Sequence, residues 1–173
     1  MVIGFFFPFG WLPESVALQV WSIFNIIEIC VIVYVALGKD GSLYNTVLTA
    51  LLCFLFPPTF DHFHLGQISI TITLCIVLAG YFLGNQQQWL VAFFIALAFS
   101  KPHLVSLVAL GLSYHYYAHA GIKRLLSFWG KAIFFALAMC APLFIAYPNW
   151  IPDAIKSMTA NPFWSYPSLF VLF

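Results

Sequence analysis

Charged side chains are scarce in this sequence. Its 173 residues include six Lys or Arg and five Asp or Glu, so 6% are charged, against about 25% in an ordinary soluble domain. Hydrophobic residues make up 64% of the chain. A soluble domain and a disordered chain are therefore excluded, and the few basic residues exclude a nucleic-acid-binding surface. The sequence predicts an integral membrane protein whose partners are membrane lipids and not nucleic acid.

Paired cysteines and a secretory signal are also missing. No Lys or Arg precedes Lys39, so residues 2–9 lack the positive region of a cleaved signal, and we expect no cleavage. The cysteines all lie in apolar runs without the spacings of a metal site or a disulfide framework, and we expect them to pack as small buried side chains. They are Cys30, Cys53, Cys75 and Cys140.

Hydrophobic runs are what the sequence does contain. Val16 to Leu37 and Leu125 to Tyr147 span 22 and 23 residues, which suffices to cross a hydrocarbon core of about 30 Å. Four other runs have only 12 to 16 residues, namely Leu43 to Phe56, Ile68 to Leu83, Trp89 to Ser100 and Leu104 to Ala118. A further run starts at Tyr166 and stops where the sequence ends. We predict an all-α, polytopic membrane protein, a single domain over residues 1–173, with about six transmembrane helices plus the start of a seventh, several of them short or broken.

The basic residues indicate the orientation. If all six runs cross the membrane, Lys39, Lys123 and Arg124 fall on one side. The positive-inside rule assigns that side to the cytoplasm. We therefore expect the polar segments 57–67 and 101–103 on the extracytoplasmic side.

These two polar segments, which we call the joints, connect short helices. Because the flanking runs are too short to reach the surface, the joints should lie recessed, where irregular backbone persists only in protein or beside a wet cavity. We predict one cavity bordered by Asp61, Gln67 and Lys101. An ammonium group at that depth needs an anion or carbonyl partner, and the phosphate of a lipid is the anion available there.

The order of several short motifs resembles a known class of enzymes. The motifs are Phe5-Phe6-Phe7-Pro8, then Trp21 and Asn25 in the first long run, Gly66-Gln67 after Pro57-Pro58, and Lys101-Pro102 after a short run. Over Phe5 to Arg124 the chain resembles membrane glycosyltransferases of the GT-C class. It is most similar to glycosyltransferase family 87, the polyprenyl-phosphate-mannose-dependent α-mannosyltransferases.

The resemblance implies a function. A sugar would be transferred, with inversion, from a polyprenyl-phosphate donor at the extracytoplasmic face, with no nucleotide-sugar domain and no other cofactor. Gly66 and Gln67 would lie by the donor or acceptor cavity, and Lys101 by the donor phosphate. We expect a multi-pass protein of a bacterial inner membrane.

The chain departs from the family in one respect. The catalytic acidic residue of these enzymes lies in the first extracytoplasmic loop, upstream of the aromatic and proline segment with which this sequence starts. Inverting transfer needs a general base, and no residue here matches it, so enzymatic activity is left open. We therefore expect one of two things. The sequence is either part of a longer enzyme or a shortened, noncatalytic relative. In the second case it would be a structural subunit of a larger pigment-binding or respiratory complex, with other membrane subunits as partners.

The joints hold the candidate substrate-binding residues. These are Asp61, His62, His64, Gly66, Gln67, Lys101 and His103. Asp61, His62 and His64 could ligate a metal, but a satisfied loop carboxylate beside two imidazoles is the favoured interpretation, and we predict no metal. Asp61 is favoured as a hydrogen-bonding anchor over a substitute base. His103 either contributes to binding or caps the next helix.

Three further polar features lie outside the joints. His115 and His119 share a helix face and could ligate haem or chlorophyll, although an interfacial aromatic belt is favoured. Gln86 to Gln88 form a polar turn to which we assign no chemistry. Glu28 and Lys131 lie at compatible depths, and we predict that they pair. In the alternative, Glu28 is neutral and bonds to Asn25 or a backbone carbonyl, while Lys131 reaches the headgroups.

Overall fold

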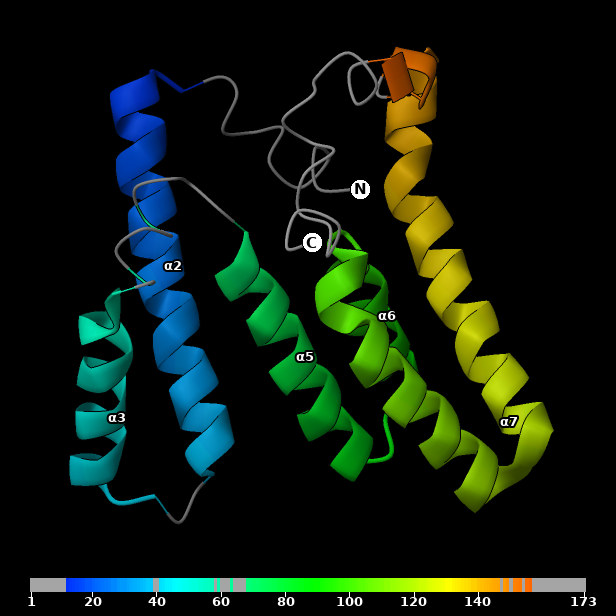
Figure 1. Ribbon diagram of the computed structural model, residues 1–173, viewed down its shortest axis with the longest axis horizontal. Helices are drawn as coiled ribbons and strands as arrows, with labels where there is room; N and C mark the ends of the chain where they lie inside the picture. Colours follow the sequence, from blue (N-terminus) through cyan, green and yellow to red (C-terminus); the bar gives the residue numbers. More distant parts are fainter. Residues whose placement is uncertain are drawn as a thin grey trace, which may run out of the picture.

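The computed structural model describes residues 12–38, 41–57, 59, 63, 68–146, 148–149, 151–153 and 155–156. The regular structure of these residues is helical. The helices are α2 (Glu14–Leu37), α3 (Leu43–Leu55), α5 (Ser69–Gly84), α6 (Gln88–Ala98) and α7 (Pro102–Ala146). Gly121 inside α7 has non-helical dihedral angles, with φ at 75°, and the chain turns back on itself there (Figure 1). The described residues thus confirm the all-helical prediction with six helical segments, each close to a predicted run.

Local signals explain where the first helices begin and end. Pro13 precedes α2, and its carbonyl accepts hydrogen bonds from the N–H groups of Val16 and Ala17. Gly38 ends α2 at a φ of 69°, a left-handed conformation that only glycine adopts without strain. Ser42 caps α3, since its hydroxyl accepts from the Asn45 N–H at 3.2 Å, as expected of an N-cap serine.

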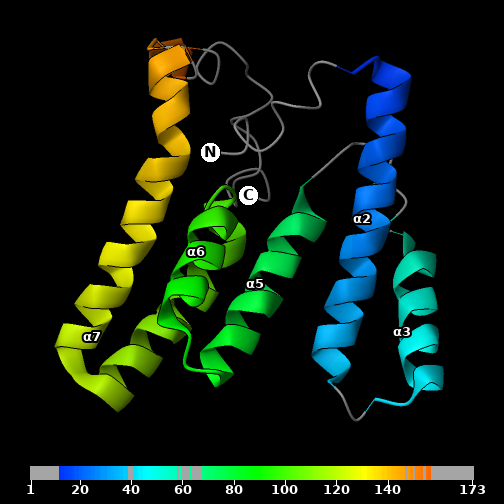
Figure 2. The ribbon, with the colours of Figure 1, turned by 180° about the vertical axis from the view of Figure 1, so that it is seen from behind.

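The helices pack side by side in alternating directions. α5 lies between α2 and α6, α7 packs on α6, and α3 packs on α2 (Figures 1 and 2). One end of the bundle holds the start of α5 and the connection from α6 to α7, and we call it the joint end. The other end holds the connections from α2 to α3 and from α5 to α6, together with the point where α7 reverses direction, and we call it the reversal end (Figure 1).

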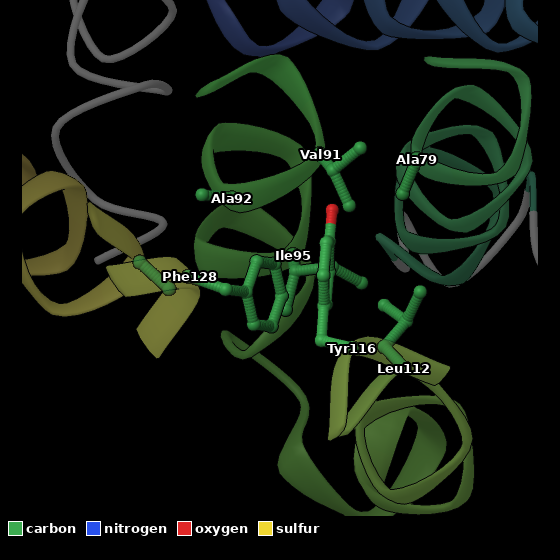
Figure 3. Close-up of a cluster of buried hydrophobic side chains, with 8 residues drawn as sticks. Ala79, Val91, Ala92, Ile95, Leu112, Tyr116 and Phe128 are labelled. Carbon is green, nitrogen blue, oxygen red and sulfur yellow. The ribbon is translucent and has the colours of Figure 1, made fainter. Parts of the chain in front are cut away.

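Two clusters of buried side chains form the core. The larger one joins α5, α6 and both halves of α7 around Ile95 and Phe128 (Figure 3). Phe128 stacks on Tyr116 with ring centroids 4.6 Å apart, and the Trp129 Nε1–H donates to the Ser113 hydroxyl at 3.0 Å. These contacts hold the two halves of α7 together. The smaller cluster consists of Ile72, Cys75, Ala98, Val105 and Ala109.

The outer surface is strongly apolar. Leu43, Leu107 and Ile145 are at least 80% exposed, as expected of side chains that face lipid. By length and composition, Ser15–Leu37 and Pro102–Pro142 could cross a membrane, and the second stretch contains the reversal at Gly121. The cysteine prediction is confirmed for Cys75, which is buried, but is wrong for Cys30, which is exposed because α2 packs on neighbours along only part of its surface.

Candidate functional site

Lys101 connects the second joint to the start of α5 at the joint end. It lies in the turn between α6 and α7, where its N–H donates to the Ala98 carbonyl at 3.1 Å. Its half-buried side chain reaches across to α5, and Nζ donates to the hydroxyl of Ser69 at 3.0 Å. Ser69 is the first residue of α5, and one residue, Ile68, separates it from the end of the first joint. The second joint and the start of α5, which are distant in sequence, therefore meet at this contact.

The surroundings of Lys101 are electropositive. α5 starts without a side-chain cap and has no acidic residue in its first turn, so no residue of that turn neutralises the positive end of its dipole. The first turn of α7, which follows Lys101, also has no acidic residue. Among the described residues, the side-chain partner of the Lys101 ammonium is a serine hydroxyl, which does not compensate its charge. An anion, and phosphate in particular, is the ligand that such an arrangement favours.

An apolar groove lies close to this contact. It has a volume of about 530 Å³ and lies between α2, α3 and α5. Ile70, the neighbour of Ser69, lines it together with Leu52 and Phe56 of the α3 side. Thr59 also lines the groove, and its hydroxyl donates to the Cys53 carbonyl at 2.8 Å, which closes the end of α3. The groove has the lining expected for a hydrocarbon chain.

The other predicted site residues have two outcomes. Asp61, His62, His64, Gly66 and Gln67 lie outside the described residues, so their grouping with Lys101 stays a prediction. His103 is described and exposed. Because α7 already begins at Pro102, His103 lies inside its first turn, and the alternative that it caps the helix is wrong. Among the described residues, no group of three or more His, Cys, Asp or Glu could hold a metal ion.

The predicted pair of Glu28 and Lys131 is wrong. Glu28, only 2% exposed, accepts a hydrogen bond from the Thr71 hydroxyl at 3.0 Å. The Asn25 amide donates instead to the Trp21 carbonyl at 2.8 Å, so the proposed alternative partners of Glu28 are also incorrect. The physical reason is the order of the helices, because α5 and α6 stand between α2 and α7 (Figure 2).

We expect Glu28 to behave as a neutral group. Its Oε1 and the Oδ1 of Asn25 have no hydrogen-bond partner among the described residues, and burying an ionised carboxylate with a single hydroxyl donor is very costly. Glu28→Gln should therefore change the free energy of unfolding by less than about 1 kcal/mol, since an amide oxygen can still accept from Thr71.

The matched variant is Thr71→Val, which removes the donor and strands a buried oxygen. It should cost about 1–3 kcal/mol. Thermal unfolding in the same detergent compares the two variants. A gain in stability for Glu28→Gln, together with a loss above about 3 kcal/mol for Thr71→Val, would show that Glu28 is buried as an anion, because the amide then removes a buried charge and valine removes its hydrogen-bond donor.

Lys131 and Gln88 form a contact that the sequence analysis missed. The Lys131 ammonium donates to Gln88 Oε1 and lies 4.8 Å from the centroid of the Trp89 ring, where a cation–π attraction adds to the hydrogen bond. Gln88 Nε2 donates in turn to the Arg124 carbonyl at 3.2 Å. The predicted polar turn thus fastens the second half of α7 to the start of α6. No motif in the sequence indicates this role.

His115 and His119 lie at the reversal end. Their rings stack with centroids 4.5 Å apart, and His119 Nδ1 lies 3.0 Å from the His115 carbonyl oxygen. Tyr114 and Tyr117 are exposed, as an interfacial belt requires, whereas Tyr116 is buried in the core.

Comparison with known proteins decides the family. The family model of glycosyltransferase family 87 matches residues 2–171. The chain belongs to glycosyltransferase family 87. No curated protein and no solved structure matches it. Family 87 is a family of membrane glycosyltransferases. The match covers more of the chain than the stretch from Phe5 to Arg124, in which the sequence motifs resemble this family.

Proposed function

We propose that this family 87 chain binds a polyprenyl-phosphate sugar at the joint end and transfers the sugar to an acceptor hydroxyl. The observation that carries the proposal is the contact of Lys101 with Ser69. It combines a cation with the uncapped start of α5, next to a groove suited to a hydrocarbon chain. A lipid phosphate suits both features, because its phosphate would bind the cation and the helix start while its hydrocarbon chain would lie in the groove.

Lys101 would stabilise the leaving group. During transfer the bond between the sugar C1 and the phosphate oxygen breaks, and its electron pair goes to that oxygen. The acceptor oxygen bonds to C1 from the opposite face, and its proton goes to a base. An ammonium group close to the departing oxygen stabilises the charge that develops there. Substrate contacts from His62, His64, Gly66, Gln67 and His103 belong to the same proposal.

The transfer also needs a base that accepts the proton of the acceptor hydroxyl. Asp61 is the carboxylate nearest in sequence to Gln67 and the groove, and we favour it as an anchor for its joint, with proton transfer as its second possible role. The runner-up function is that of a noncatalytic structural subunit of a larger membrane complex. Donor binding without transfer would distinguish this function from the enzyme.

The distribution of charge supports an extracytoplasmic site. Lys123 and Arg124 follow Gly121 at the reversal end, and the positive-inside rule assigns such residues to the cytoplasm. The joint end then faces outward. A lipid-linked donor suits this face, because the sugar is carried by the membrane itself. We propose a multi-pass protein of a bacterial inner membrane.

Photo-cross-linking tests donor binding in the groove. A polyprenyl phosphate with a photoreactive group in its chain is added to membranes that contain the complete gene product. We expect labelled peptides from α3 and α5, and loss of most labelling in Thr49→Trp, since Thr49 lines the groove. Leu48→Trp is the matched control. Leu48 is the neighbour of Thr49 in the sequence, but its side chain is exposed and does not line the groove. Labelling spread evenly over all helices, or equal in both variants, would contradict the proposal.

A further inference from the structure

A second pocket lies at the reversal end, far from Lys101. It has a volume of about 330 Å³ and is formed where the turn between α5 and α6 meets the two halves of α7. Its polar lining consists of Gln86, Gln88, His115, Tyr116, His119 and Arg124. We propose that this pocket binds a phosphate-bearing anion at the reversal end of the bundle, opposite to the joint end. This inference does not depend on the proposed function.

The lining has the chemistry of an anion site. All six polar side chains can donate hydrogen bonds, and the one that is permanently charged, Arg124, is a cation. The lining contains no acidic residue. The Arg124 side chain is exposed, and no described carboxylate pairs with it. A guanidinium group presents its N–H groups in a fork that matches two oxygens of a phosphate.

The pocket is also held in shape by contacts between its own residues. Gln88 bridges the Arg124 carbonyl and the Lys131 ammonium, which fixes the chain that follows the reversal against the start of α6. On the other side, His119 bonds to the carbonyl of His115, and the stacked rings keep a fixed orientation. Tyr116 is anchored in the core by Phe128 (Figure 3). Such preorganisation lowers the entropic cost of binding.

Gln86 provides an independent observation. It has a φ of 58°, and it is the only residue other than glycine with a positive φ in the described part of the chain. Its N–H donates to the Leu83 carbonyl and that of Gln87 donates to the Phe82 carbonyl, both at 3.0 Å. This is the pattern of a helix end at which glycine is usual. A strained residue whose side chain lines a pocket favours a role for that side chain in binding.

Two sources of the anion share this chemistry. One is the phosphate headgroup of a lipid in the same leaflet, and the other is a soluble phosphate compound. Two probes separate them. The first is inorganic phosphate added to the purified protein in detergent, and the second is phosphatidic acid in phosphatidylcholine nanodiscs, with phosphatidylcholine alone as reference.

The readout is the unfolding temperature as each probe is titrated, because a ligand that binds the folded state stabilises it by mass action. We expect Arg124→Gln to weaken apparent binding roughly tenfold or more, the effect of losing one charge-assisted contact. Lys123→Gln is the matched control. It removes the same charge one residue away, but Lys123 does not line the pocket, so binding should be weakened less than about twofold.

Gln86→Gly separates binding from folding. Removing the strain should raise the unfolding temperature without probe, while the loss of the side chain weakens binding. Stabilisation by phosphatidic acid alone identifies a lipid ligand, and stabilisation by inorganic phosphate identifies a soluble one. Equal losses in Arg124→Gln and Lys123→Gln would indicate diffuse surface charge and overturn the proposal. It is also overturned if neither probe stabilises the wild type beyond sodium chloride at equal ionic strength, or if Gln86→Gly binds as the wild type does.

Discussion

Replacing Lys101 with methionine should slow sugar transfer by about 10²–10³-fold, as expected when one preorganised donor to a developing negative charge is removed. Methionine keeps an unbranched side chain of similar length, so the groove and the turn between α6 and α7 should persist. The fold should tolerate the change, because the partner that loses its contact is only the Ser69 hydroxyl. Initial rates with a polyprenyl-phosphate sugar measure the effect.

Two companion variants make this result specific. Lys101→Arg keeps the positive charge and should retain part of the activity, although the geometry differs. Ser69→Ala removes the hydroxyl that positions Lys101 but leaves the cation and the helix start in place, so the loss should be below about tenfold. Wild-type rates in Lys101→Met, with unchanged KM, would show that Lys101 does not contact the donor phosphate.

Replacing Phe128 with alanine should give the largest loss of stability. Phe128 is 0% exposed and contacts both Tyr116 and Trp129, so truncation leaves a cavity between the two halves of α7. Buried Phe→Ala changes cost about 3–5 kcal/mol. We expect about 3 kcal/mol, because lipid is as apolar as the core and the transfer term is smaller.

Phe134→Ala is the matched control for this prediction. Phe134 lies in the same half of α7 but is 59% exposed, so its removal should cost less than about 1 kcal/mol. Denaturant unfolding in mixed micelles measures both variants. Equal losses would mean that Phe128 does not occupy the core and that α7 does not fold back at Gly121 as described.

The helices could be predicted from the sequence because lipid imposes long apolar runs, and the breaks between runs mark the turns. The reversal at Gly121 corresponds to the polar break between Ala118 and Leu125. The alternation of the runs predicts a common side for the two joints, and the start of α5 lies at the same end of the bundle as the connection from α6 to α7 (Figure 1). The contact of Lys101 with Ser69 could not be predicted, because serine in the first turn of an apolar helix carries no specific signal.

Side-chain partners were the part that sequence reasoning got wrong. Depth along a helix can be calculated from the rise per residue, and it made Glu28 and Lys131 appear compatible. Depth does not reveal which helices are neighbours, and here α5 supplies Thr71 to Glu28 while α6 supplies Gln88 to Lys131. The strained Gln86 has a weak signal in the sequence, which is the absence of glycine immediately after Asn85 at a helix end.

The central claim is that the donor is a lipid-linked sugar bound at the joint end. The complete gene product, reconstituted in liposomes with an acceptor extract from the membrane, is given either polyprenyl-phosphate mannose or a nucleotide-linked mannose, each with a labelled sugar. We predict acceptor-dependent release of polyprenyl phosphate and labelled product from the first donor only, with both lost in Lys101→Met. Transfer from the nucleotide-linked sugar, or lipid-linked transfer that Lys101→Met leaves intact, would contradict the account.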